Sequence, residues 1–260
     1  MISNLCALQF VTTNDYQANL DKLISLIESS PKDSVIVAPE LCLSGYAYDN
    51  MLSASQFTKK AIKTICSLST DKTIVLTMVT KSGEKFFNTA YVFHKNKILH
   101  KQSKHQLFVL NDERKFFTSG NKNKIKIFEI NGIKIAILIC FELRFIDLWQ
   151  KIKGADIILV PSMWGIIRKE HFETLTKALA IANQCYVIAS DGANDDLAKG
   201  SGIISPFGKE NRDDTQELLC SEFDPKEIKK MRKYMNIGIT PPINNLNNSS
   251  FIISSIKAET

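Results

Sequence analysis

Short apolar runs bounded by polar turns recur along this chain, and they limit its fold more than any other feature. Runs of this length are typical of buried strands, because a buried helix needs a longer stretch. The predicted strands are 5–10, 34–38, 73–79, 89–94, 125–130, 133–139, 156–160 and 186–190.

Helical patterns lie between these strands. The apolar stripes are Leu20/Leu23/Ile24/Ile27, Leu143/Ile146/Trp149/Ile152 and Phe172/Leu175/Leu179/Ala182. Asn14 or Asp15 is the candidate N-cap of the first helix. Asn131-Gly132 predicts a hairpin with a type I′ turn, and residues 95–97 predict a second hairpin. Because helices alternate with strands but some neighbouring strands form hairpins, we predict an α/β protein with mixed sheets and helices outside.

The composition fits one large domain. The chain has 260 residues, of which 44% are hydrophobic, so it can bury a sizeable core. We assign residues 1–235 to the core domain and residues 236–260, rich in Asn, Pro and Ser, to a C-terminal extension. The net charge of +6 is only mildly basic. The dense run Lys226–Lys233 is interpreted as a solvated helix face, and no nucleic-acid partner is expected because no recognition motif accompanies it.

The cysteine pattern favours a reducing environment. The six cysteines, at 6, 42, 66, 140, 185 and 220, form no C-x-x-C pair, and several lie inside apolar runs. We therefore expect neither a disulfide framework nor a zinc site. The N-terminus lacks the pattern of a signal peptide, and no apolar run is long enough for a membrane span. These features predict a cytoplasmic protein with no membrane association.

Two reactive side chains follow predicted strands directly. Glu40 follows the strand 34–38 and one proline, and Cys140 follows the strand 133–139. Taken singly, the cysteine could be core filler and the glutamate a helix-start charge. Ligands of α/β proteins bind beyond the carboxyl ends of strands, so the two side chains can converge on one pocket. We also expect the dipole of the helix after Cys140 to favour its thiolate.

A cysteine nucleophile needs a base. None of the four histidines, His94, His100, His105 and His171, ends a clear buried strand, so a Cys–His pair is possible but not favoured. Glu40 is the alternative base. A glutamate in water is too acidic to deprotonate a thiol, so this hypothesis requires burial, with a nearby lysine to stabilise the developing oxyanion.

Several blocks resemble the carbon–nitrogen hydrolases of the nitrilase superfamily. The three main blocks are "VIVAPELCLSGY", "HKQSKHQLF" and "ILICFELRF". The resemblance implies Glu40 as general base, Lys104 as catalytic lysine and Cys140 as nucleophile. The block "NDERKFFTSG" is similar to the segment with the second glutamate of the family, which implies that Glu113 orients the lysine and substrate. Departures from the family occur at Leu179, Ala182 and Asp191-Gly192, outside this catalytic set.

The resemblance also implies architecture and chemistry. The expected fold is a four-layer α/β/β/α sandwich that assembles as a homodimer or higher homo-oligomer. The expected reaction is hydrolysis of an amide or carbamoyl group of a small molecule through a thioester, with no metal or organic cofactor. Lys104 and the backbone N–H of Phe141 would hold the oxyanion.

The substrate is less constrained. The short gap from Lys104 to Glu113, together with Trp164, looks most like ω-amidases, which act on short α-keto acid amides. Deaminated-glutathione amidases are close relatives of these enzymes. Arg144, Arg168 and Lys169 are candidate partners for a substrate carboxylate, although Arg144 has an alternative structural role.

Other functions stay open. The alternative enzyme is an N-carbamoyl amide hydrolase of the β-ureidopropionase (β-alanine synthase) or N-carbamoylputrescine amidase type, and nitrile hydrolysis is less expected. A non-catalytic scaffold on the same fold is a further alternative. The intact set of Glu40, Lys104, Glu113 and Cys140 argues against a scaffold.

Overall fold

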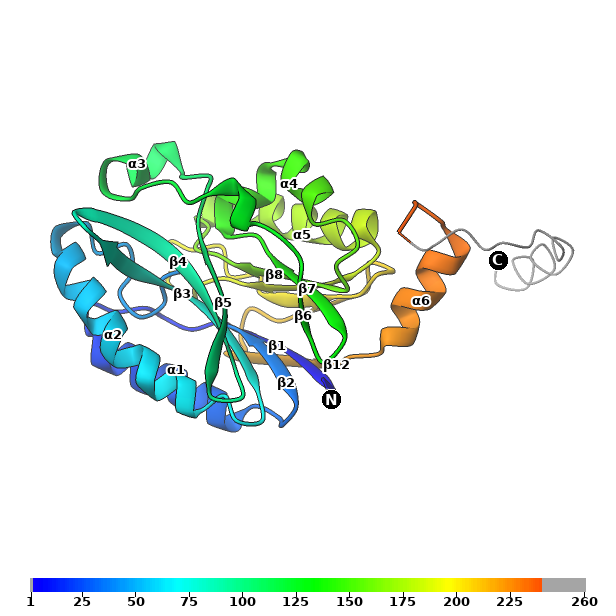
Figure 1. Ribbon diagram of the computed structural model, residues 1–260, viewed down its shortest axis with the longest axis horizontal. Coiled ribbons are helices and arrows are strands. Elements are labelled where there is room, and N and C mark those ends of the chain that lie inside the picture. The colour runs from blue at the N-terminus through cyan, green and yellow to red at the C-terminus, as the bar shows by residue number, and fades with distance from the viewer. Residues whose placement is uncertain (1, 240–260) are drawn as a thin grey trace, which may run out of the picture.

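The computed structural model describes residues 2–239, which contain two sheets with helices on their outer faces (Figure 1). The strands of the first sheet are β1 (Asn4–Leu8), β2 (Ser34–Val37), β3 (Thr73–Ser82), β4 (Lys85–His94), β5 (Lys97–Ser103) and β12 (Leu218–Glu222). Those of the second are β6 (Phe128–Ile130), β7 (Ile133–Ile137), β8 (Ile157–Pro161), β9 (Tyr186–Ser190), β10 (Gly202–Ile204) and β11 (Glu210–Arg212).

Helices connect these strands. The α-helices are α1 (Tyr16–Ser29), α2 (Met51–Ser67), α3 (Glu113–Phe116), α4 (Ile146–Lys151), α5 (Lys169–Asn183) and α6 (Pro225–Tyr234). The 3-10 helices are η1 (Tyr48–Asn50), η2 (Val109–Asn111), η3 (Lys122–Lys124), η4 (Cys140–Arg144) and η5 (Ile166–Arg168).

Both sheets are mixed. Each has six strands, in the orders β12-β1-β2-β3-β4-β5 and β11-β10-β9-β8-β7-β6. The pairs β1–β2, β2–β3, β7–β8 and β8–β9 are parallel, and the outer pairs are antiparallel. The carboxyl ends of the central strands in each sheet therefore lie at one edge, which is the usual place of a binding site in α/β sheets.

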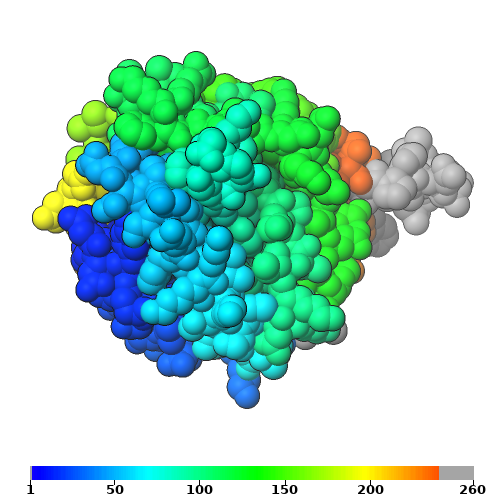
Figure 2. Space-filling model, turned by 60° about the vertical axis from the view of Figure 1, so that its left-hand side comes forward, coloured from blue at the N-terminus to red at the C-terminus, as the bar shows by residue number. Residues whose placement is uncertain are grey.

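Side-chain alternation in the strands creates the layers. In β1, Leu5 and Ala7 join the core between the sheets, whereas Cys6 and Leu8 join the core beneath α1 and α2. Since successive strand residues point to opposite faces, both faces of this sheet are covered. Blue and light-blue atoms of α1 and α2 cover one side of the molecule in Figure 2, and α4 and α5 lie beyond the second sheet (Figure 1). The predicted four-layer α/β/β/α sandwich is confirmed.

The structure confirms the helix cap and the two hairpin turns that the sequence predicted. The Asp15 carboxylate accepts hydrogen bonds from the N–H groups of Gln17 and Ala18, so Asp15 is the N-cap of α1. Asn131 and Gly132 have φ values of +52° and +81° in the hairpin between β6 and β7. The hairpin between β4 and β5 turns through two further positive-φ residues, at 95 and 96.

Two predicted helical stripes were wrong in detail. The chain after Cys140 forms the 3-10 helix η4 before the short helix α4, and Ile146 of the predicted stripe is exposed. In α5, Ala182 is exposed, and Thr176 and Asn183 are buried in its place. The Thr176 hydroxyl can be buried because it donates a hydrogen bond to the Phe172 carbonyl within the helix. The predicted apolar stripe is therefore interrupted by polar side chains.

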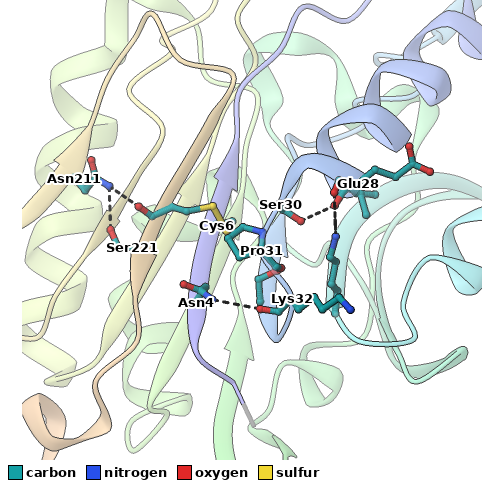
Figure 3. The surroundings of a disulfide bond; sticks show 12 residues. Asn4, Cys6, Glu28, Ser30, Pro31, Lys32, Asn211 and Ser221 are labelled. Carbon is teal, nitrogen blue, oxygen red and sulfur yellow. Dashed lines mark hydrogen bonds between the residues drawn. A yellow bond between two sulfur atoms is a disulfide. The ribbon is translucent and has the colours of Figure 1, made fainter.

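The expectation of a chain without disulfides was wrong. Cys6 and Cys220 are directly opposed in the antiparallel pair β1–β12, with Cα atoms 4.3 Å apart, and their sulfur atoms form a disulfide (Figure 3). Asn211 donates hydrogen bonds to the Cys220 carbonyl and the Ser221 hydroxyl beside it. The cysteine pattern therefore no longer supports a reducing compartment, and the cytoplasmic location stays a prediction.

The C-terminal region ends in a basic helix. The buried side of α6 presents Ile228 and Met231, while its lysines face outward, as the solvated-face interpretation predicted. Residues 236–239 follow α6, and the rest of the predicted extension, 240–260, lies outside the described residues. No helix within residues 2–239 is long and apolar enough to cross a bilayer.

The disulfide gives the first prediction. It closes a loop of 214 residues, so removing it should lower the free energy of unfolding by about 2–5 kcal/mol. The double variant Cys6→Ala/Cys220→Ala should show this loss in denaturant titration. Dithiothreitol should lower the stability of the wild type toward that of the variant and leave the variant unchanged. Equal stability of the oxidised wild type and the variant would contradict the prediction.

Candidate active site

The two sheets are joined by a hydrogen bond at the edge where their central strands end. The N–H of Glu40, just beyond β2, donates to the carbonyl of Ser162, just beyond β8, at 3.0 Å. Cys140 lies beyond β7 in the same sheet as β8. The structure therefore brings the strand-end residues Glu40 and Cys140 to the same edge.

A buried lysine lies at the centre of this edge. Lys104 Nζ is 2.8 Å from Glu40 Oε1, and 2.8 and 3.0 Å from the two carboxylate oxygens of Glu113. All three side chains are completely buried. Burial alone would lower the pKa of Lys104, but the neighbouring Glu40, Cys140 and Glu113 raise it above its usual value. Lys104 is therefore a fixed ammonium with two carboxylate partners.

The two carboxylates have further donors. Glu40 Oε1 also accepts from the side-chain amide of Asn88 at 2.7 Å, and Oε2 accepts from the hydroxyl of Tyr46 at 3.3 Å. Glu113 accepts from the N–H of Phe108, and burial raises its pKa despite the opposing effect of Lys104. These bonds fix both carboxylates around the lysine. Sequence analysis missed Asn88, because a single asparagine within a strand carries no signal.

Cys140 occupies a constrained turn. Its φ is +49°, a left-handed conformation that is unusual for a residue with a side chain, and strain of this kind is concentrated at functional sites. The thiol lies beside the Glu40 carboxylate and near the backbone N–H of Met163. Burial, followed by the charge of Glu40, raises its pKa well above the usual value, against the effect of Lys104. These effects oppose the thiolate that we expected a helix dipole to favour.

A cavity of about 530 Å³ opens above the thiol. Its lining includes the predicted residues Cys140, Phe141, Arg144, Trp164 and Arg168. The other lining residues are Tyr46, Tyr48, Phe108, Leu110, Asn111, Met163, Gly165, Asp196 and Leu197. The walls are therefore mostly apolar and aromatic, with a few charged groups, which is typical of a small-molecule site.

The two arginines present positive charge to this cavity. The Arg144 guanidinium lies 4.6 Å from the centre of the Trp164 ring and is 2.9 Å from His171 Nδ1. The Arg168 guanidinium lies 5.3 Å from the centre of the Phe108 ring. Within residues 2–239, neither has a carboxylate at salt-bridge distance, whereas Lys169 is paired with acidic side chains outside the cavity. The cavity can therefore bind an anionic group.

The histidines do not approach the thiol. No histidine lines the cavity, the His105 ring bonds to the Gly120 carbonyl, and His171 bonds to Arg144. The geometry thus brings Cys140 together with Glu40 and not with an imidazole.

Two further buried carboxylates lie near the site, and the sequence analysis did not identify them. Glu142 accepts from the backbone N–H groups of Ile139 and His105, each at 2.7 Å, and burial raises its pKa to about 7. Asp191 accepts from the N–H of Trp164 at 2.8 Å and so holds one wall of the cavity. The two acidic residues lie near the Cys140 turn and at the end of β9, but an isolated acidic residue predicts no partner.

Comparisons with known proteins agree on one family. The family model described as carbon–nitrogen hydrolase matches residues 5–233. The chain is 28% identical to a 2-oxoglutaramate amidase of Bacillus subtilis (strain 168), over 83% of this chain and 88% of that protein. It is 25% identical to a deaminated glutathione amidase of Escherichia coli O157:H7, over 88% and 93%. A branch 10 nitrilase-superfamily structure from Saccharomyces cerevisiae superposes with a TM-score of 0.79 and 24% identity, over 90% and 94% of the two chains.

The buried ion cluster gives the second prediction. Lys104→Met would leave two buried carboxylates without a cation and should destabilise the fold by about 3–5 kcal/mol. Lys22→Met is the matched control, because the Lys22–Glu217 pair is exposed and should contribute only about 0–1 kcal/mol. Thermal or denaturant unfolding of the two variants measures the loss of stability in each. Equal losses in the two variants would contradict the assignment of Lys104 as the cation that neutralises this cluster.

Proposed function

Since the chain belongs to the carbon–nitrogen hydrolase family and is an amidase, we propose that it hydrolyses the terminal carboxamide of a small acid through a thioester on Cys140, releasing ammonia. The observation that carries this proposal is the position of the Cys140 thiol, which lines an arginine-containing cavity and lies beside Glu40, the partner of the buried Lys104.

Formation of the thioester uses Glu40 as the base. Cys140 Sγ attacks the amide carbon as Glu40 takes the thiol proton, which gives a tetrahedral oxyanion. The Lys104 ammonium and the N–H of Phe141 stabilise that oxyanion. The N–H of Phe141 can do so because the first N–H groups of a helix such as η4 lack an intrahelical partner. The C–N bond then breaks, and Glu40 returns the proton to the leaving nitrogen, which departs as ammonia.

Hydrolysis of the thioester repeats these roles. Glu40 removes a proton from water as the water oxygen attacks the thioester carbonyl, and the same donors hold the second oxyanion. The C–S bond then breaks, the acid leaves and Cys140 regains its proton from Glu40. Glu113 stays bound to Lys104 throughout, and its carboxylate keeps the ammonium oriented toward the reacting carbon.

The cavity supports a substrate with its own carboxylate. Arg144 and Arg168 line the cavity without carboxylate partners, and a guanidinium binds a carboxylate through charge-assisted hydrogen bonds. The relative from Bacillus subtilis is named for 2-oxoglutaramate, a short α-keto acid amide of this kind. We therefore propose an ω-amidase-like reaction. Homo-oligomeric assembly rests on family resemblance, and the domain division at residue 235 and a cytoplasmic location stay predictions from the sequence.

A substrate panel tests the reaction class. We expect ammonia release from short α-keto acid ω-amides to exceed that from deaminated glutathione, N-carbamoyl compounds and nitriles. Preference for the N-carbamoyl compounds, with release of carbon dioxide, would instead assign the alternative hydrolase activity. Absence of turnover with every compound would favour a scaffold protein.

The third prediction concerns the nucleophile. Cys140→Ala should abolish ammonia release and preserve the fold, whereas Cys66→Ala, which removes a free thiol from α2, should retain activity. Intact-protein mass spectrometry should detect an acyl adduct on the wild type after rapid quenching and none on Cys140→Ala. Substantial turnover by Cys140→Ala would sink the assignment.

The fourth prediction concerns the carboxylate. Arg168→Met should raise KM for an ω-amide acid by about 10- to 100-fold, because a charge-assisted contact contributes roughly 1.5–3 kcal/mol. A neutral amide without the carboxylate serves as the internal control and should show no comparable change. If KM for the two substrates rises equally, Arg168 shapes the cavity and does not bind the carboxylate.

A further inference from the structure

A buried carboxylate lies two residues beyond the proposed nucleophile and has no part in the steps above. Glu142 is fully buried in η4 and is not among the residues that line the cavity. Both of its carboxylate oxygens are bonded to backbone N–H groups, so we expect any effect on the reaction to act through other residues.

The two oxygens of Glu142 bind two different segments. Oε2 accepts from the N–H of Ile139 at 2.7 Å, and Oε1 accepts from the N–H of His105 at 2.7 Å. Ile139 directly precedes Cys140, and His105 directly follows Lys104. One carboxylate therefore joins the backbone beside the nucleophile to the backbone beside the oxyanion-binding lysine.

These segments come from different sheets. The Cys140 turn extends from β7 of the second sheet, and the Lys104 segment extends from β5 of the first. Another polar link between these strands is the bond from the Gln102 side chain to the Ile137 carbonyl, at 3.2 Å, which lies two residues before Lys104 and three before Cys140. Hydrogen bonds to a carboxylate are about twice as strong as those between neutral groups, so the Glu142 bridge is the stiffer link.

The same carboxyl residue also supports the Cys140 turn. The N–H of Glu142 donates to the carbonyl of Ile139 at 3.0 Å, so Ile139 is held by both its N–H and its carbonyl. A left-handed residue such as Cys140 persists only where its surroundings determine its conformation. The bonds on Ile139 supply that constraint immediately before the strained residue.

We infer that Glu142 is a positioning residue that fixes Cys140 Sγ and Lys104 Nζ relative to one another across the two sheets. This inference rests on the proposed function, in which the oxyanion formed on attack by the Cys140 sulfur must meet the lysine ammonium. A displacement of about 1 Å in such an arrangement can reduce the rate about 10²-fold.

The test compares Glu142→Gln with Glu227→Gln in the full chain. A glutamine at 142 presents an NH₂ group to one of the two N–H donors, so it breaks one arm of the bridge. Glu227 lies on α6 and accepts a hydrogen bond from the Tyr186 hydroxyl, so Glu227→Gln makes the same chemical change away from the site. We expect Glu142→Gln to lower kcat about 10²-fold with KM changed by less than about threefold, and Glu227→Gln to leave both unchanged.

Activity is expressed per folded molecule, with the folded fraction measured by circular dichroism at the assay temperature, so that unfolded protein does not count. A Glu142→Gln enzyme with a lower melting temperature but with kcat per folded molecule within twofold of the wild type would overturn the inference. If Glu142→Gln does not fold, Glu142→Asp replaces it, since the shorter side chain cannot reach both donors and should show the same kcat loss.

Failure of both variants to fold would assign Glu142 to folding and would also overturn a positioning role. A wild type that releases no ammonia from any compound of the panel would refute the proposed function instead. The two failures are therefore distinguishable.

Discussion

The rest of the site depends on the ion cluster formed by Lys104, Glu40 and Glu113. Removing three charged groups from water is costly, and the cost is offset only when the ions meet at hydrogen-bond distance and their remaining atoms are also bonded. The amide of Asn88 and the N–H of Phe108 supply those additional bonds. The cluster therefore constrains the ends of β2 and β5 and the start of α3 to one arrangement. A rigid, buried environment follows, in which the charge of the lysine would act on a substrate more strongly than it does in water.

The two sheets are held in register by polar contacts as well as by the apolar core. Near the site, Glu40 bonds to Ser162, and the hydroxyl of Ser190 donates to the Leu8 carbonyl at 2.5 Å. Each of these bonds joins the end of a central strand of one sheet to the end of a strand in the other. An apolar interface alone is non-directional and would tolerate sliding, whereas these bonds fix the relative position of the strand ends. Glu40 and Cys140 follow the ends of β2 and β7, so these hydrogen bonds between the sheets help to set the geometry of the proposed site.

The sequence predicted those elements whose signal is local. Strands such as β9 are continuous apolar runs, and Asn131-Gly132 specifies its hairpin through backbone conformation alone. In contrast, α2 buries Ser55 and Thr58 among its apolar side chains, so its apolar stripe is interrupted, and β11 is entirely polar. The disulfide depends on the pairing of β1 with β12, which no local pattern encodes. Likewise, motif resemblance indicated Glu40, Lys104 and Cys140, whereas Glu142 became evident only when its two distant partners were in place.

In the mechanism that we propose, the raised pKa of the Cys140 thiol favours coupling of the proton transfer to the attack. A free thiolate would add a negative charge to a buried cluster that already holds two carboxylates against one ammonium. Transfer of the proton from sulfur to Glu40 avoids this cost, because one anion disappears as another forms and the net charge of the cluster is unchanged. When sulfur attacks, the negative charge moves to the substrate oxygen beside Lys104, where it is stabilised most. The environment that disfavours a Cys140 thiolate in the free enzyme thus favours the transition state, in which the negative charge lies on the substrate oxygen.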